Sequence, residues 1–186
     1  ILHTLSERAP IPLSEIDAKR IRMLSGSPLR PRDLIALLVL ALGSNPEQLE
    51  AVRADRRLVK PAVEETLRWA GPVGTSTRQT TETTELAGTK LEEGALIGAV
   101  LSSANRDPRR FTDPDRFDVH RREGAHLAFA VGSHFCLGAW FGRHMARVSL
   151  DILLDRLPGL QLDVDRPATL SGWEFRAPDS TWVRWD

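Results

Sequence analysis

Cysteine is almost absent from this chain: its 186 residues contain one, Cys136. A single cysteine excludes an internal disulfide and suits a reducing cytoplasm, where we expect the protein to reside. An excess of charge of one sign is also missing, because 25 Lys and Arg residues balance 25 Asp and Glu residues. Without a net field, nothing draws the chain to nucleic acid or to an anionic membrane surface. We therefore expect neither as a partner.

Several other signals are missing as well. The chain opens Ile1-Leu2-His3, with no initiator Met, no charged segment and no apolar segment of the kind that begins a secretory leader. It is therefore not expected to be secreted, and its start is consistent with a fragment. The sequence shows no internal repeat, low-complexity tract or Gly-rich phosphate loop. With 41% hydrophobic and 27% charged residues, its composition is ordinary for a globular domain.

Periodicity and breaker residues predict a mixed but mainly helical fold with small β-sheets. Apolar residues at helical spacing and start or stop signals predict helices over residues 31–42, from residue 46, over 59–69 and over 137–157, with a further short helix at 15–24. Asn45 and Gln48 are spaced as a capping-box variant around the first-turn Pro46. Threonine-rich and apolar runs over 75–101 predict β-hairpin strands, and the alternating tail from residue 160 predicts further strands. An irregular loop rich in Asp, Arg and Pro is expected over 104–118, anchored by Phe111 and Phe117.

The segment around the lone cysteine, Phe129 to Gly138, is the most informative stretch. Gly132 permits a tight turn, Gly138 leaves an open face beside the sulfur, and an apolar helix follows at once. A cysteine at a helix N-terminus is favoured as the thiolate, which is the form that binds metal. The residues alone leave three other readings open: a buried cysteine acting as a small hydrophobe, a cysteine–histidine nucleophile, or a zinc site shared with His126, His134 or His144.

The spacing Phe129-x-x-Gly132-x-x-x-Cys136-x-Gly138 resembles the heme-ligand loop of the cytochrome P450 family. The resemblance implies heme b (iron protoporphyrin IX) as the cofactor, with Cys136 as the iron ligand and Phe129, Gly132 and Gly138 shaping the loop. It further implies that Arg78 and His134 donate hydrogen bonds to the two heme propionates. One position departs from the family pattern, because Ala130 stands where that loop usually carries glycine.

Two further motifs extend the resemblance. Glu65-x-x-Arg68 resembles the family's Glu-x-x-Arg helix motif, and residues 114–117 resemble the later motif that supplies a second arginine, here Arg116. The resemblance implies that Glu65 is clamped between Arg68 and Arg116. Planar guanidinium groups can hold a carboxylate bidentately and so fix a loop on a helix. We interpret all three residues as structural.

The resemblance predicts a single partial cytochrome P450 domain over residues 1–186. Residues 1–44 correspond to a remnant of the central helices, and 45–186 to the Glu-x-x-Arg helix, the hairpins, the cysteine loop and the helix after it. The family's Ala-Gly-x-x-Thr segment, whose acid–alcohol pair delivers protons to oxygen, has no counterpart here. Roughly four helical turns between residues 40 and 41 and the N-terminal half of the family fold are expected to be missing.

The resemblance implies a heme-thiolate monooxygenase that inserts one oxygen atom from O2 into a small hydrophobic organic substrate. Electrons would come from a ferredoxin-type partner, for which Arg143 and Arg147 are candidate contacts, although a solvated helix face is the favoured explanation of these arginines. The alternative is a truncated, catalytically inactive heme-binding remnant of such an enzyme. Oxidation driven by peroxide lies between the two, because it needs no sequential electron delivery.

Overall fold

The computed structural model describes residues 29–185, so the short helix predicted at 15–24 lies outside the described part. The helices are α3 (Leu29–Gly43), α4 (Pro46–Ala54), α5 (Val59–Ala70), α6 (Leu101–Ala104) and α7 (Ala139–Arg156), with 3-10 turns η1 (Arg56–Leu58) and η2 (Gly132–His134). The strands are β1 (Thr75–Gln79), β2 (Thr84–Leu86), β3 (Thr89–Leu91), β4 (Leu96–Val100), β5 (Gln161–Leu162), β6 (Leu170–Ser171), β7 (Ala177–Pro178) and β8 (Val183–Arg184). The four main predicted helices are confirmed to within about three residues at each end.

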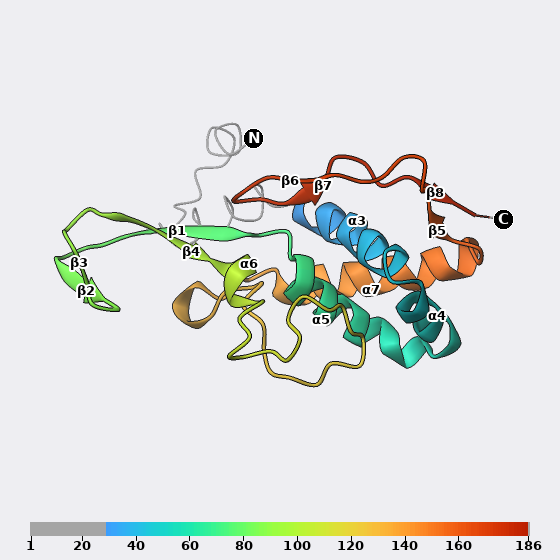
Figure 1. Ribbon diagram of the computed structural model, residues 1–186, viewed down its shortest axis with the longest axis horizontal. Coiled ribbons are helices and arrows are strands. Elements are labelled where there is room, and N and C mark those ends of the chain that lie inside the picture. The colour runs from blue at the N-terminus through green and yellow to red at the C-terminus, as the bar shows by residue number, and fades with distance from the viewer. Residues whose placement is uncertain (1–28, 186) are drawn as a thin grey trace, which may run out of the picture.

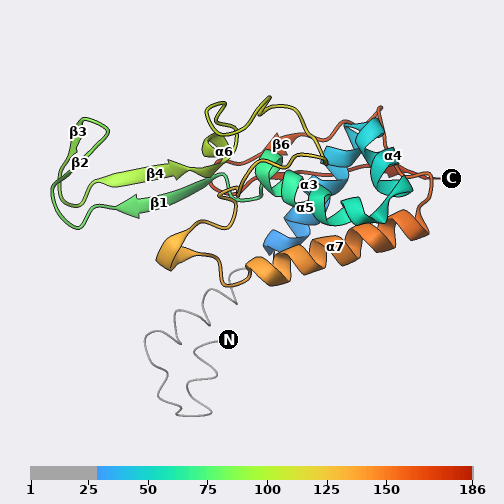
Figure 2. The ribbon, with the colours of Figure 1, turned by 90° about the horizontal axis from the view of Figure 1, so that it is seen from below.

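Three helices form the body of the molecule. Figures 1 and 2 show α3 and α5 lying along α7, and each of the three contacts the other two. Their facing side chains are leucine, valine and alanine at helical spacing, as the periodicity predicted. The core lies among these helices and consists of buried residues that include Leu34, Leu38, Leu42, Val63, Leu67, Ala146, Leu150 and Leu154.

The predicted hairpins form an arm that projects from this body. Strand β1 pairs antiparallel with β4, and the β2–β3 hairpin lies at the far end of the ribbon (Figure 1). Residues 81–90 are all exposed. The turn between β2 and β3 places Ala87 and Gly88 at φ values of 50° and 79°, the left-handed region that such turns require.

Two further segments, the loop after β4 and the C-terminal tail, pack on this body. The loop over 104–118 is anchored as predicted, because Phe111 and Phe117 are only 2% and 3% exposed. After α7, the tail runs back along α3 in Figure 1 and forms two short antiparallel ladders, β5–β8 and β6–β7. Within residues 29–185, no helix has the length and apolar character needed to cross a membrane.

The capping-box prediction at the start of α4 is wrong. Asn45 occupies the N-cap position, but its side chain makes no capping hydrogen bond and instead donates to the carbonyl of Ala41 at 2.8 Å. Gln48 is buried, and its side-chain oxygen accepts a hydrogen bond from the backbone N–H of Val119 at 2.9 Å. A long-range partner has therefore replaced the local one, and Gln48 fixes the distant loop on α4.

Candidate functional site

The cysteine loop is closed by its own backbone. The N–H of Cys136 donates to the carbonyl of Phe129 at 2.9 Å, and the N–H of Phe135 donates to the carbonyl of Gly132 at 3.0 Å. The carbonyl of Cys136 in turn accepts from the N–H of Ala139, the first residue of α7, at 3.2 Å. The sulfur is therefore presented at the entrance to α7, as the sequence predicted.

Two residues of this loop adopt left-handed backbone conformations. Gly132 has φ of 69°, which explains why the turn carries glycine there. Ala130 has φ of 56°. An L-residue in this conformation costs about 1–2 kcal/mol. The departure from the family's glycine at position 130 is therefore a local source of strain that the surrounding loop tolerates.

The surroundings of Cys136 fit a flat apolar macrocycle. Val131, Phe135 and Leu137 are 65%, 54% and 61% exposed, an unusual concentration of bare apolar side chains on one short loop. A side chain at Gly132 would meet no atom within 4 Å, and one at Gly138 would meet only the sulfur of Cys136, at 3.9 Å. Within residues 29–185, no group of three His, Cys, Asp or Glu side chains could hold a metal ion. A zinc site at Cys136 would therefore lack its ligands in this part of the chain. A lone sulfur ligand suits iron whose other ligands come from a macrocycle.

The two residues expected to contact propionates are exposed and available. Arg78 lies on β1 opposite Ile97 of β4, and its guanidinium donates to the carbonyl of Thr77 at 2.8 Å. His134 ends the turn η2 within the cysteine loop. Their role toward a cofactor remains a prediction.

Helix α5 carries a buried ion pair between Glu65 and Arg68. The guanidinium of Arg68 donates to both oxygens of Glu65, at 2.7 and 2.8 Å, and the two side chains are only 2% and 4% exposed. Arg68 also donates to the carbonyls of Asn105, Pro114 and Arg116, at 3.0, 2.8 and 3.1 Å. The motif therefore fastens the irregular loop to α5.

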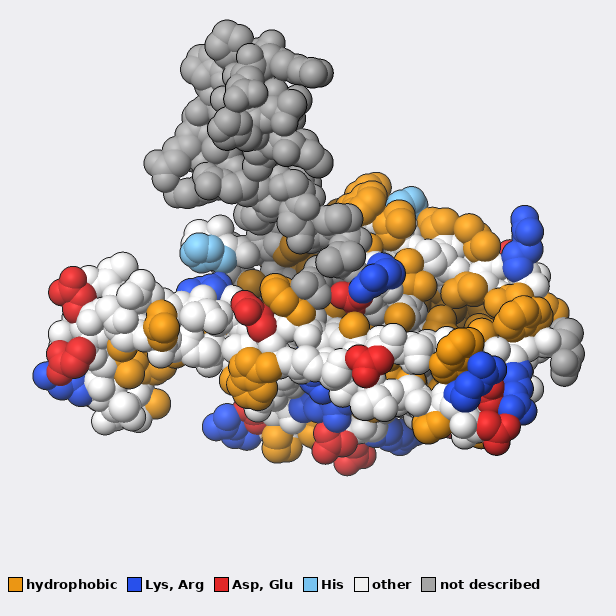
Figure 3. All heavy atoms as spheres, turned by 90° about the horizontal axis from the view of Figure 1, so that it is seen from above, with side chains coloured by type: hydrophobic (Ala, Val, Ile, Leu, Met, Phe, Trp, Pro, Cys, Tyr) orange, Lys and Arg blue, Asp and Glu red, His pale blue; other side chains and the backbone are white. Residues whose placement is uncertain are grey.

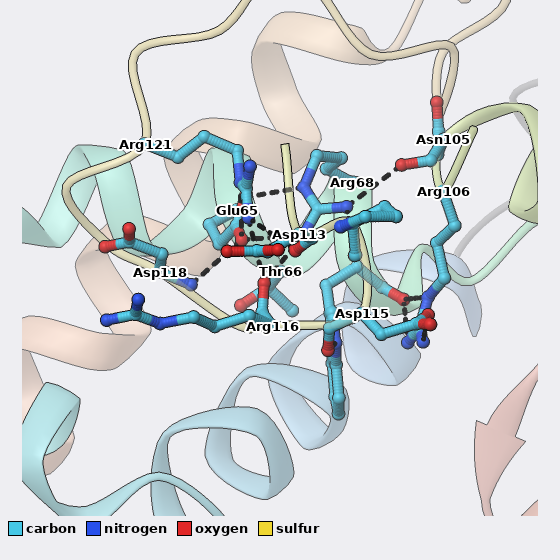
Figure 4. A network of polar contacts seen from close by, with 12 residues as sticks. Glu65, Thr66, Arg68, Asn105, Arg106, Asp113, Asp115, Arg116, Asp118 and Arg121 are labelled. Carbon is cyan, nitrogen blue, oxygen red and sulfur yellow. Dashed lines mark hydrogen bonds and ion pairs between the residues drawn. The ribbon is translucent and has the colours of Figure 1, made fainter. Parts of the chain in front are cut away.

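The second guanidinium that contacts Glu65 belongs to Arg121. The prediction that Arg68 and Arg116 together clamp Glu65 is therefore wrong for Arg116. Arg121 is 8% exposed and donates to Glu65 at 3.1 Å, whereas the exposed Arg116 points its guanidinium away (Figure 4). Arg116 contributes its carbonyl, which accepts from both Arg68 and Arg121. Residues 106–122 include six arginines, and no local signal indicates which one folds back onto α5.

A second polar cluster was not found from the sequence. Glu64 lies on the neighbouring face of α5 and pairs with Arg143 of α7 at 2.8 Å and with His126 at 3.1 Å, instead of with Arg68 four residues later. Buried Asn105 accepts the backbone N–H of Leu127 at 2.7 Å. In the sequence, only the position of His126, just before the cysteine loop, could have drawn attention to the cluster of Glu64, His126 and Arg143.

The fold and the loop are together typical of a protein that binds heme through a cysteine thiolate. The family model described as "Cytochrome P450" matches residues 40–171, more than half of the chain. The chain belongs to the cytochrome P450 family.

Several bacterial proteins are similar to this chain. The "Cytochrome P450 monooxygenase PikC" of Streptomyces venezuelae is 48% identical over 133 residues, 71% of this chain. The "Pulcherriminic acid synthase" of Bacillus subtilis is 36% identical over 162 residues, 82% of this chain. Among solved structures, the ligand-free cytochrome P450 TbtJ1 superimposes with a TM-score of 0.86 at 35% identity, over 95% of this chain.

The chain is much shorter than these proteins. It spans 32% of PikC, 40% of pulcherriminic acid synthase and 47% of TbtJ1. The described fold thus corresponds to less than half of each.

Proposed function

We propose that this chain is the cysteine-bearing, heme-binding part of a heme-thiolate monooxygenase. The observation that carries the proposal is the closed loop that presents Cys136, flanked by exposed apolar side chains, in a chain of the cytochrome P450 family. When bound, heme b supplies the activation of O2 that allows one oxygen atom to be inserted into a small hydrophobic organic substrate.

The residues of this chain bind and orient the cofactor. Cys136 would ligate the iron as thiolate, and Gly132 and Gly138 leave the space in which a flat ring can approach. Arg78 and His134 would donate charge-assisted hydrogen bonds to the propionates. Glu65 and Arg68, with Arg121, keep the supporting loop on α5.

The test is the absorption spectrum of the heme-reconstituted chain after reduction and addition of carbon monoxide. Thiolate ligation gives a strongly red-shifted Soret band, which Cys136→Ala should abolish. Ser133→Ala is the matched control, because it removes one side-chain oxygen from the same exposed turn and leaves the sulfur in place. Failure of the wild-type chain to take up heme, or an unchanged band in Cys136→Ala, would overturn the proposal.

A ferredoxin-type protein is the proposed electron donor. An open hollow of about 440 Å³ is lined by Lys60, Arg143 and Arg147 together with Glu64, Trp140 and His144. Arg143 is neutralised by Glu64, and among the described residues Lys60 and Arg147 form no ion pair. An acidic partner would therefore contact Lys60 and Arg147 first. Lys60→Glu with Arg147→Glu should weaken ferredoxin binding, with the greatest effect at low ionic strength.

The second candidate is a heme-binding remnant without activity. The observation behind it is that the chain spans a third to a half of the length of its relatives, and the reaction needs a site from which water is excluded. Peroxide-supported oxidation of a hydrophobic substrate by the heme-loaded chain separates the two. Turnover that Cys136→Ala abolishes supports the enzyme, and heme binding without turnover supports the remnant.

A further inference from the structure

Glu64 connects three elements that lie far apart in the sequence. Its carboxylate accepts hydrogen bonds from Nε of Arg143 at 2.8 and 3.1 Å and contacts Nε2 of His126 at 3.1 Å. His126 precedes the cysteine loop and Arg143 lies on α7 directly after it, so one carboxylate on α5 is bonded to both ends of the segment that carries Cys136.

The ring of His126 is held in one tautomer. The backbone N–H of Ala128 donates to Nδ1 of His126 at 3.2 Å, and a backbone N–H can only donate. In the neutral ring, Nε2 therefore carries the hydrogen that Glu64 accepts. The side chain is 8% exposed, so the ring is fixed by burial as well as by its two partners.

The cluster reaches Cys136 through Phe129. The guanidinium of Arg143 lies over the Phe129 ring at 4.4 Å, and the His126 ring contacts the same ring at a centroid distance of 6.2 Å. The carbonyl of Phe129 accepts the N–H of Cys136 and so closes the loop. The two side chains that contact the Phe129 ring, Arg143 and His126, are thus both bonded to Glu64.

We propose that Glu64, acting through His126 and Arg143, is the positioning residue of the Cys136 loop. Any effect of Glu64 on heme binding rests on the proposed function, since the loop is the one that would hold heme. Its effect on the order of the loop can be tested in the heme-free chain. Burial of Glu64 raises its pKa, but hydrogen bonds from His126 and Arg143 outweigh burial and lower the pKa to about 2, so the carboxylate is ionised at neutral pH.

The test uses the sulfur itself as the probe. Because Cys136 is the only cysteine, a thiol reagent such as iodoacetamide labels that position alone, and in the heme-free chain the sulfur is free to react. Glu64→Gln keeps the size of the side chain but removes the charge that holds Arg143. We expect labelling of Cys136 at pH 7 to become about 5- to 10-fold faster, where tenfold corresponds to about 1.4 kcal/mol of loop opening.

The matched control is Asp155→Asn. Asp155 also ties α7 to another element through one ion pair, with Arg56 at 2.9 Å, but it lies at the opposite end of the helix. In Asp155→Asn, the labelling rate of Cys136 should stay within about twofold of the wild type. Glu64→Asp, which restores the charge on a shorter side chain, should recover part of the protection. These two variants separate loop positioning from a general loss of stability.

A second readout tests the same loop directly. Amide hydrogen exchange at Cys136 should accelerate in Glu64→Gln, whereas exchange at Leu150, in the buried face of α7, should not. In the heme-loaded protein, Glu64→Gln should lower the fraction that shows the thiolate Soret band.

The possible outcomes distinguish the two proposals. Unchanged labelling and exchange at Cys136 in Glu64→Gln, or equal acceleration at Leu150, would overturn the positioning role whether or not heme binds. Accelerated labelling in a chain that takes up no heme would support the positioning role and reject the proposed function.

Discussion

Arg121 and Arg116 offer a direct test of the ion cluster on α5. The side chain of Arg121 is 8% exposed and donates to Glu65, to Glu123 and to the carbonyls of Thr112, Asp113 and Arg116, at distances from 2.6 to 3.2 Å. The exposed Arg116 uses only its backbone in this network. The same substitution, arginine to methionine, should therefore have very different effects at the two positions.

The magnitude follows from what Arg121→Met leaves behind. Removing one partner of a buried ion pair costs about 3–5 kcal/mol. Glu65 keeps the bidentate contact with Arg68 and the N–H of Asp118 at 2.9 Å, so we expect the lower end, about 3 kcal/mol. Arg116→Met should stay within about 0.5 kcal/mol, as is usual for an exposed side chain.

The assay is urea unfolding followed by the fluorescence of the five tryptophans. With a slope of about 2 kcal/mol/M, Arg121→Met should lower the midpoint by about 1.5 M and Arg116→Met by less than about 0.3 M. If Arg121→Met does not fold, Arg121→Lys provides the comparison, because it keeps the charge and loses the planar fork. Equal midpoint shifts at the two positions, or a larger shift for Arg116, would refute the assignment of Arg121 as the second arginine.

Three further predictions concern the cysteine loop and its support. Ala130→Gly should relieve the left-handed strain and, after the extra entropy of the unfolded chain, raise the free energy of unfolding by about 0.5–1 kcal/mol in the same urea assay; a decrease would show that the loop is not strained at Ala130. Cys136→Ala should change that free energy by less than about 1 kcal/mol, because the side chain is only partly buried, so a large loss would mean that the sulfur packs as core. The carboxyl of Glu64 has its pKa lowered from 4.5 to about 2 on folding, so its contribution to stability is present above pH 4.5 and is lost as the pH falls toward 2. The stability difference between wild type and Glu64→Gln, measured by urea unfolding at several pH values, should therefore shrink across that window, and a constant difference would contradict the prediction.

Hydrophobic side chains on the outside bear on how the chain behaves in these experiments. Figure 3 shows hydrophobic side chains interspersed with polar and charged ones on one face of the molecule. Along α7, Phe141, Met145, Val148 and Ile152 are 37–55% exposed. An apolar face of this extent promotes association. The unfolding measurements should therefore be made at protein concentrations low enough that the urea midpoint does not change with concentration.

Much of the architecture follows from local signals. Apolar spacing along α3, α5 and α7, with start and stop signals such as the Pro158-Gly159 pair after α7, predicted these helices to within about three residues at each end. The threonine-rich runs gave the hairpin arm. These features are readable because a turn residue or a helical repeat acts within a few positions of itself.

The cysteine loop was also largely determined by its own sequence. Gly132 adopts the left-handed conformation that its position implied, and Cys136 precedes α7 as expected. The turn closes through hydrogen bonds between residues less than ten positions apart. Sequence alone therefore sufficed to place Cys136 before α7 with open space beside it.

Only the tertiary structure decided which distant groups meet. It selected Arg121 over Arg116 for Glu65, paired Glu64 with His126 and Arg143 instead of Arg68, and gave Gln48 a partner 71 residues away in place of a helix cap. Glu64 and Gln48 each had a plausible local partner, whereas for Glu65 the choice lay between two distant arginines. The choice among them depends on the path of the irregular loop across α5 and on burial, which makes an unpaired charge costly wherever the loop comes to lie.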